Sequence, residues 1–262
     1  MTIADQVDGL FDERPIALAT GRRIQGGVAS SDVVHSAAVA GNAEIFPEIL
    51  GLHVPPNAVI ADVTWGKGVF WSRVPGSQLD DYTVLVSDLD TGVDATNLPY
   101  GDESLDALVF DPPYMEGLFR ADAGNLAGGG SHAAFREHYS NGLTTVANGN
   151  EHRPKYHQAV LDLYERAGVE ARRVLRTEGI YIVKCQDEVS ANRQELTHVQ
   201  IIRHLESLDF YCRDLFVVVR RNRAGLSRVK KQVHARKNHS YFLVFQKAPV
   251  ARGEKMKSKP LA

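Results

Sequence analysis

The sequence of 262 residues is short of cysteine, of long apolar runs and, over one stretch, of acidic side chains. Its two cysteines, Cys185 and Cys212, exclude a disulfide framework and lack metal-ligand spacing, as is typical of a reducing, cytoplasmic setting. No run approaches the roughly 18 apolar residues of a membrane span, and the start of the chain lacks the pattern of a secretory signal. We therefore expect a cytoplasmic protein with no membrane contact.

Residues 215–253 contain no Asp or Glu, although the net charge of the whole chain is −2. The basic residues of this stretch are Arg220, Arg221, Arg223, Arg228, Lys230, Lys231, Arg236, Lys237, Lys247 and Arg252. A basic block on an otherwise acidic chain favours a polyanionic partner. The alternative is that the block is only a solvated loop and tail. We expect residues 249–262 to form a basic C-terminal tail.

Along most of the chain, short apolar runs typical of strands alternate with segments that have helical periodicity. Strands are expected at residues 58–63, 82–87, 105–110, 180–184, 214–219 and 241–245. Helices at 155–176 and 195–208 separate several of these strands, which predicts an α/β fold with a mainly parallel sheet. The last two strands have no good helix between them, so we expect them to pair as an antiparallel hairpin at one edge.

Two segments have no clear secondary-structure pattern. Residues 1–42 are interrupted by glycines, and we expect an N-terminal arm there. Residues 115–153 contain seven glycines. A loop of this length is usually functional or disordered. We expect a mobile lid or target-recognition loop at 115–153, with disorder as the alternative.

Two motifs follow predicted buried strands. The loop Gly66-Lys67-Gly68 comes after strand 58–63, where glycine lets the backbone approach a nucleotide-like ligand and leaves N–H groups facing it. The tetrapeptide Asp111-Pro112-Pro113-Tyr114 comes after strand 105–110. Its prolines end the strand and leave a carboxylate and an aromatic ring at the strand exit, where ligands bind in parallel sheets. The alternative is a strand terminator followed by a solvated turn.

Together with Asp62, Asp88, Asp90 and Asp94, these motifs form an ordered set that resembles the S-adenosylmethionine-dependent amino-methyltransferases of nucleic acids. This is the DPPY-type adenine-N6/cytosine-N4 DNA methyltransferase family. The resemblance covers roughly residues 44–247, including 238–245, which is similar to the family's closing strand. It implies a Rossmann-like seven-stranded methyltransferase sheet with the last strand inserted antiparallel, in a single domain at 43–248.

The resemblance also implies S-adenosyl-L-methionine as the cofactor. Its implied cofactor-binding residues are Phe46, Pro47, Asp62, Thr64, Gly66, Gly68, Asp88, Asp94 and Asp111. For Phe46 and Pro47 the alternative is ordinary helix packing, and for Asp94 it is capping of the turn at Leu98. The sequence departs from the family in leaving five residues between Asp88 and Asp94, too few for the usual helix, so whether Asp88 or Asp90 holds the cofactor ribose stays open.

The chemistry of the tetrapeptide can be argued from its residues. An exocyclic base amine is a poor nucleophile because its lone pair is delocalised into the ring. The Asp111 carboxylate and the Pro112 carbonyl can each accept one N–H, which frees the lone pair for in-line attack on a sulfonium methyl group. Tyr114 would stack on a base flipped out of a duplex. This reaction needs no metal, and the sequence indicates none.

The preferred function is therefore methyl transfer to adenine N6 in DNA, because the Asp form of the tetrapeptide favours adenine in the resembling family. The alternatives are cytosine N4 in DNA, guanine N2 or adenine N6 in RNA, and a non-catalytic nucleic-acid-binding subunit of a heteromer. Trp71 excludes the G-x-G-x-x-G motif of nicotinamide dehydrogenases, and no P-loop pattern is present.

The large target-recognition domain of many DNA members of the family is absent. Residues 115–153 and the basic block would have to take over its task. The expected substrate-binding residues are Tyr114, Phe119, Arg228, Lys230 and Lys231. Lys184, Cys185 and Gln186 lie at the exit of strand 180–184 and could line the pocket, but we expect them on the surface.

Overall fold

The computed structural model describes residues 33–115, 156–221 and 231–249, and the backbone of four two-residue strands. These short strands are β5 (Leu118–Phe119), β6 (Leu126–Ala127), β7 (Thr144–Thr145) and β8 (Glu151–His152). The chain divides into two units, Met1–Val33 and Val34–Ala262, and the fold below is that of the second unit.

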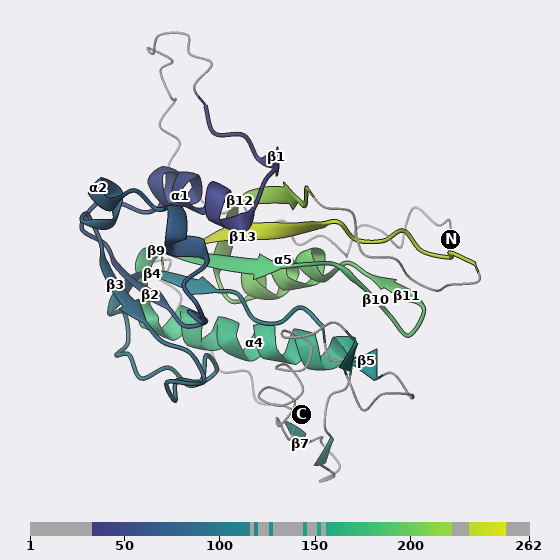
Figure 1. Ribbon diagram of the computed structural model, residues 1–262. Coiled ribbons are helices and arrows are strands. Elements are labelled where there is room, and N and C mark those ends of the chain that lie inside the picture. The colour runs from purple at the N-terminus through teal and green to yellow at the C-terminus, as the bar shows by residue number, and fades with distance from the viewer. Residues whose placement is uncertain are drawn as a thin grey trace, which may run out of the picture. The chain divides into compact units, whose positions relative to one another are not determined.

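Seven strands form the main sheet within the described residues, and their chain order differs from their order in space (Figure 1). Across the sheet they are β1 (Ala37–Val39), β12 (Phe210–Val219), β13 (His239–Lys247), β9 (Leu175–Cys185), β4 (Leu105–Phe110), β2 (Val59–Asp62) and β3 (Thr83–Val86). β13 runs antiparallel to both of its neighbours, and the other pairs are parallel. The predicted α/β class and the antiparallel insertion of the last strand are confirmed.

The edges of the sheet differ from the expectation in one respect. β1 lies inside the segment expected to form an N-terminal arm, and it pairs with β12 through Ala37 to Val39. The antiparallel pair β12–β13 therefore lies one strand in from the edge. At the opposite edge of the sheet, β3 is the outermost strand among the described residues. Between Asp88 and Leu105 the chain adds no further strand to the sheet.

Helices cover both faces of the sheet (Figure 1). α1 (Asn42–His53) and the short helix η2 (Phe70–Arg73) pack on one face, with α2 (Gly76–Leu79) beside α1. α4 (His157–Val174) and α5 (Thr197–Ser207) pack on the other and agree closely with the two helices predicted there. In the part of the chain that the structure describes, no helix is long and apolar enough to cross a membrane.

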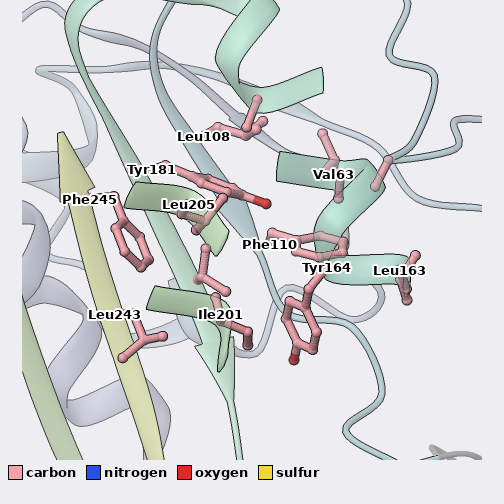
Figure 2. Close-up of a cluster of buried hydrophobic side chains, with 14 of the residues drawn as sticks. Val63, Leu108, Phe110, Leu163, Tyr164, Tyr181, Ile201, Leu205, Leu243 and Phe245 are labelled. Atoms are coloured by element: carbon pink, nitrogen blue, oxygen red, sulfur yellow. The ribbon is translucent and has the colours of Figure 1, made fainter. Parts of the chain in front are cut away.

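Successive side chains of each strand point to opposite faces of the sheet, and this divides the core into two clusters. In β4, Leu108 and Phe110 point toward α4 and α5, whereas Ala107 and Val109 point toward α1 and η2. Figure 2 shows part of the α4–α5 cluster, in which Tyr181 of β9 and Phe245 of β13 lie in the same layer as Phe110 and Tyr164. Every second residue of a strand therefore faces α1, and this fixes the direction of the polar side chains at the strand ends.

A clamp from α4 holds the loop between β3 and β4, where the sequence leaves too few residues for the usual helix. Arg173 donates hydrogen bonds to the carbonyl oxygens of Leu98 (2.9 Å) and Tyr100 (2.8 Å). The same guanidinium pairs with Asp102 (2.8 Å) and Glu170 (2.7 Å), and Glu170 in turn accepts the N–H of Leu98. The loop is thus fixed by charge-assisted hydrogen bonds in place of a packed helix.

Candidate active site at the carboxyl ends of the strands

Four polar side chains form a row across neighbouring strands at the carboxyl-end edge of the sheet. They are Asp62 of β2, Asp111 after β4, Lys184 of β9 and Ser240 of β13. Each lies two residues along its strand from a core residue that faces α1, so all four belong to that face. The pairing of Asp62 with Val109, Phe110 with Val183, and Lys184 with Phe242 brings these strand ends side by side.

Asp62 anchors the start of the glycine loop. Its carboxylate accepts hydrogen bonds from Trp71 Nε1 (2.8 Å) and from the Thr64 N–H (3.0 Å). Burial raises the pKa of Asp62, and these hydrogen bonds act against the rise. Trp71, which stands where a dinucleotide-binding loop would have its third glycine, therefore supports the loop through its indole N–H.

The loop requires glycine at two positions. Gly66 has φ +52° and Gly68 has φ +63°, a region that favours glycine. A Cβ on Gly68 would also lie 2.6 Å from Cζ2 of Trp65. The Gly66 N–H points to Asp88 Oδ2 at 3.1 Å, which joins the loop to the end of β3. The Gly68 N–H donates to the carbonyl of Trp65 at 2.8 Å, so both glycine amides donate within the protein, and ligand binding at the loop stays a prediction.

The tetrapeptide is tied to the glycine loop by one hydrogen bond. The backbone N–H of Asp111 donates to Thr64 Oγ1 at 2.7 Å, so the two predicted motifs are in direct contact. The Tyr114 hydroxyl donates to Asp111 Oδ1 at 2.6 Å. Its pKa lies well above the usual value because of burial and the neighbouring Asp111. The ring predicted to stack on a base is therefore held against the carboxylate in this structure.

The charge on Asp111 depends on its neighbours in the row. Burial raises the pKa of Asp111 to about 6, against the opposing effects of the Tyr114 hydrogen bond and the Lys184 charge, and Asp62 adds to the rise. Lys184 is 1% exposed, and burial lowers its pKa to about 8 while Asp111 raises it. Its ammonium donates to Ser240 Oγ at 2.6 Å and lies 4.3 Å from the ring centroid of Phe242. A carboxylate and an ammonium thus share one desolvated environment, an arrangement common at functional sites.

Lys184 and Cys185 correct a prediction. We expected them on the surface, but Lys184 is 1% exposed and Cys185 is fully buried, because β9 is a central strand covered on both faces. The sequence signal that could have revealed Lys184 is its place at the end of an apolar strand, like Asp62 and Asp111.

Other predicted cofactor residues are occupied by local contacts. Phe46 is fully buried against Phe70, Trp71 and Phe242, at centroid distances of 5.4, 5.0 and 6.2 Å, and its contact with a cofactor stays a prediction. The carbonyl of Pro47 accepts a hydrogen bond from Gln78 Nε2 at 3.0 Å.

Two acids after β3 stabilise their own turns. Asp94 is exposed, and its Oδ1 accepts the N–H and hydroxyl of Thr96, each at 2.8 Å, so it caps the turn before Leu98. Asp88 accepts the N–H of Thr91 at 2.9 Å as well as that of Gly66. A contact of either acid with a cofactor stays a prediction.

Several predicted substrate contacts lie outside the described residues. These are the side chain of Phe119, Arg228 and Lys230, with most of 115–153 and of the C-terminal tail. Lys231 is described and is exposed. Within the described ranges, no group of three or more His, Cys, Asp or Glu side chains is arranged to hold a metal ion.

No protein-family model and no curated protein matches the chain. Among solved structures, it resembles a candidate DNA modification methylase from Thermus thermophilus, with 15% identity and a TM-score of 0.36 over 63% of this chain and 54% of that one. It also resembles an S-adenosylmethionine-dependent methyltransferase from Methanosarcina mazei (12% identity, TM-score 0.41, 76% of this chain and 97% of that one).

A third similar structure is a candidate methyltransferase from Bacillus halodurans, with 11% identity and a TM-score of 0.45 over 78% of this chain and 99% of that one. The chain spans about half the length of the Thermus protein. All three TM-scores are below 0.5, so the chemistry of the site has to be derived from its own residues.

Proposed function

We propose that the protein transfers a methyl group from S-adenosyl-L-methionine to the exocyclic N6 amine of adenine in DNA. The observation that carries this proposal is the hydrogen bond between Thr64 and Asp111, which joins a ligand-binding glycine loop to a carboxylate at a proline-stiffened strand exit. Methyl transfer requires the cofactor site to lie next to the group that binds the target amine. The Thr64–Asp111 contact supports the presence of both sites in one place.

The glycine loop fits the cofactor. Gly66 and Gly68 give the loop a tight backbone with positive φ, and Asp62 and Asp88 hold its two ends. When bound, S-adenosyl-L-methionine supplies an electrophilic methyl group on a positively charged sulfur. The Gly66–Gly68 backbone would hold it beside Asp111.

Asp111 would act on the target amine. With Oδ1 occupied by Tyr114, an incoming amine can donate to Oδ2 and to the carbonyl of Pro112. Alternatively, the amine displaces the Tyr114 hydroxyl, and the ring is then free to stack on the base. Transfer of the methyl group to the amine nitrogen would leave that nitrogen with one proton to lose. A carboxylate with a pKa of about 6 can take that proton at neutral pH.

The test is an assay with methyl-labelled S-adenosyl-L-methionine and either duplex DNA or RNA, followed by digestion to nucleosides. The expected product is N6-methyladenine in DNA. Label on cytosine or in RNA would reassign the substrate, and no transfer despite cofactor binding would favour a non-catalytic subunit.

Two variants test the role of Asp111 itself. Asp111→Ala should abolish transfer while calorimetry still detects cofactor binding. Asp111→Asn keeps the shape but loses the charge, and we expect it to be inactive too. Unchanged turnover in either variant would refute the role of Asp111.

A further inference from the structure

A hairpin leaves the sheet beside the candidate site. β10 (Glu188–Ser190) and β11 (Arg193–Glu195) pair antiparallel, and they are joined by Ala191 and Asn192 with φ of +49° and +60°. Two positive φ values define a tight two-residue turn. The hairpin begins three residues after the end of β9, the neighbour of β4, and it projects beyond the strand ends (Figure 1).

Buried contacts fix the root of this hairpin to three elements. Asp187 contacts His198 Nδ1 of α5 at 2.7 Å and accepts the hydroxyl of Tyr241 of β13 at 3.3 Å. Glu188 contacts His157 Nδ1 of α4 at 2.7 Å. Asp187 and Glu188 are both buried. The hairpin is therefore held in one direction before any ligand arrives, which reduces the ordering cost of binding.

The described part of the basic block packs along the hairpin. His234 Nε2 contacts the carbonyl of Asn192 at 2.9 Å, and the ammonium of Lys237 donates to Gln194 Oε1. The partner of Lys237 is a neutral amide, so its positive charge is not compensated by this contact. Residues 188–195 and 231–239 together are called the hairpin surface below.

The hairpin surface presents cations without acidic partners. Among the described residues, no salt bridge involves Arg193, Lys231, Arg236 or Lys237, which are exposed or half-buried. The acids in and beside it, Asp187, Glu188 and Glu195, contact His198 or His157. Near the opposite ends of the strands, Arg176 is paired with Asp106. Unpaired cations on one rigid surface fit a polyanion.

We propose that the hairpin surface is the DNA-recognition element of this protein, with the turn Ala191–Asn192 entering a groove and the surrounding cations contacting phosphates. This inference rests on the proposed function. A two-stranded ribbon fits the major groove, and an Asn side chain can pair with the edge of adenine. Asn192 is exposed at the tip and can present its amide, while Arg193 and Lys237 lie where they can flank it. The surface would set the position of the duplex relative to Asp111.

The test compares two charge-removing variants in the full chain. Binding to duplex DNA is measured by fluorescence anisotropy between about 50 and 200 mM salt. The logarithm of the binding constant falls as the logarithm of the salt concentration rises, and Arg193→Ala should reduce the magnitude of this slope by about one. Arg213→Ala is the matched control, since Arg213 is also exposed but lies near the start of β12, at the other end of the sheet. Its slope should equal that of the wild type.

A second variant tests recognition rather than charge. Asn192→Gly keeps the positive φ of the turn and removes the side chain. We expect an unchanged salt slope and about a tenfold loss of preference among methylated sequences, measured by sequencing modified sites in plasmid DNA. Circular dichroism and cofactor calorimetry verify that each variant is folded.

The outcomes separate this inference from the proposed function. If the wild type binds and methylates DNA but Arg193→Ala and Asn192→Gly behave like it, the hairpin surface is not the recognition element. If the wild type binds no DNA, both the inference and the DNA substrate are refuted. Reduced slope and relaxed specificity in the variants, with intact cofactor binding, support the inference.

Discussion

Replacing Lys184 with methionine should move the acid limb of the pH profile of methyl transfer to higher pH. Asp111 must be ionised to accept an N–H of the target amine. Lys184 lowers the pKa of Asp111 against the opposing effects of burial and Asp62, with Arg220 and Cys185 as the other ionisable groups that act on Lys184. Loss of the ammonium therefore raises the pKa of Asp111, so Asp111 is protonated in a larger fraction of the protein molecules at neutral pH.

The size of the effect follows from the pKa of about 6 for Asp111. At pH 7 about nine tenths of the wild type is ionised, and removing an opposite charge in a buried site raises a carboxyl pKa by about 1–3 units. Ionisation would then fall to between about one half and one hundredth, so the rate at pH 7 should drop about 2-fold to 100-fold. The rate should recover at alkaline pH, where Asp111 is ionised again.

The assay is kcat/KM for labelled transfer across the pH range, with two controls. Lys184→Arg keeps a cation and should leave the limb near its wild-type position. Ser240→Ala removes the hydrogen bond of Lys184 but not its charge, and should shift the limb less than Lys184→Met. A uniform loss of rate at every pH in Lys184→Met, with an unmoved limb, would refute the electrostatic role and leave Lys184 a packing residue.

Three further predictions concern the loop, the clamp and the hairpin root. Gly68→Ala should cost about 1–3 kcal/mol in urea unfolding and weaken cofactor binding in calorimetry, because its Cβ meets the ring of Trp65 and its φ is +63°. Arg173→Met should cost about 1–3 kcal/mol in urea unfolding, since it removes charge-assisted hydrogen bonds to the loop before β4. Burial lowers the pKa of His157, but its contacts with Glu188, Gln200 and Glu195 outweigh burial and raise it. The stability that this gives is present below pH 6.5, is lost as pH rises through the raised pKa, and should disappear in His157→Gln.

Each of these has an outcome that contradicts it. Gly76→Ala is the control for Gly68, because a Cβ there meets nothing within 4 Å, and equal losses in both variants would remove the steric explanation. An unchanged urea midpoint in Arg173→Met would mean that the loop needs no clamp. The same pH dependence of stability in His157→Gln and the wild type would assign that dependence to another group.

The parts of the fold and site that the sequence predicted are those set by local pattern and strand order. Apolar runs ending in Asp62 and Asp111 identified two strands whose carboxyl ends lie together, because β2 and β4 are neighbours in the sheet. The glycines at 66 and 68 predicted a loop after the strand, and both residues have positive φ in that loop. The Thr64–Asp111 contact follows from these two placements.

The parts that the sequence did not reveal depend on which segments become neighbours. Lys184 is buried because β13 inserts beside β9 and brings Ser240 and Phe242 against it, and nothing near position 184 encodes that contact. Phe46 packs inward because η2 and β13 close over it. The hairpin at 188–195 is short and polar, so its strands have no apolar alternation by which they could be predicted.

The inserted strand β13 also constrains the order in which the protein can be assembled. It lies between β9 and β12, and β1 can pair only with the outer side of β12, some 180 residues later in the chain. During synthesis, Asp62, Asp111 and Lys184 emerge well before Ser240 and Phe242, so the ammonium stays hydrated until the last strand is in place. Contacts this distant in sequence form slowly. A nascent chain would therefore hold a sheet with its glycine loop already formed, and the charge balance at Asp111 would be established in the final folding step.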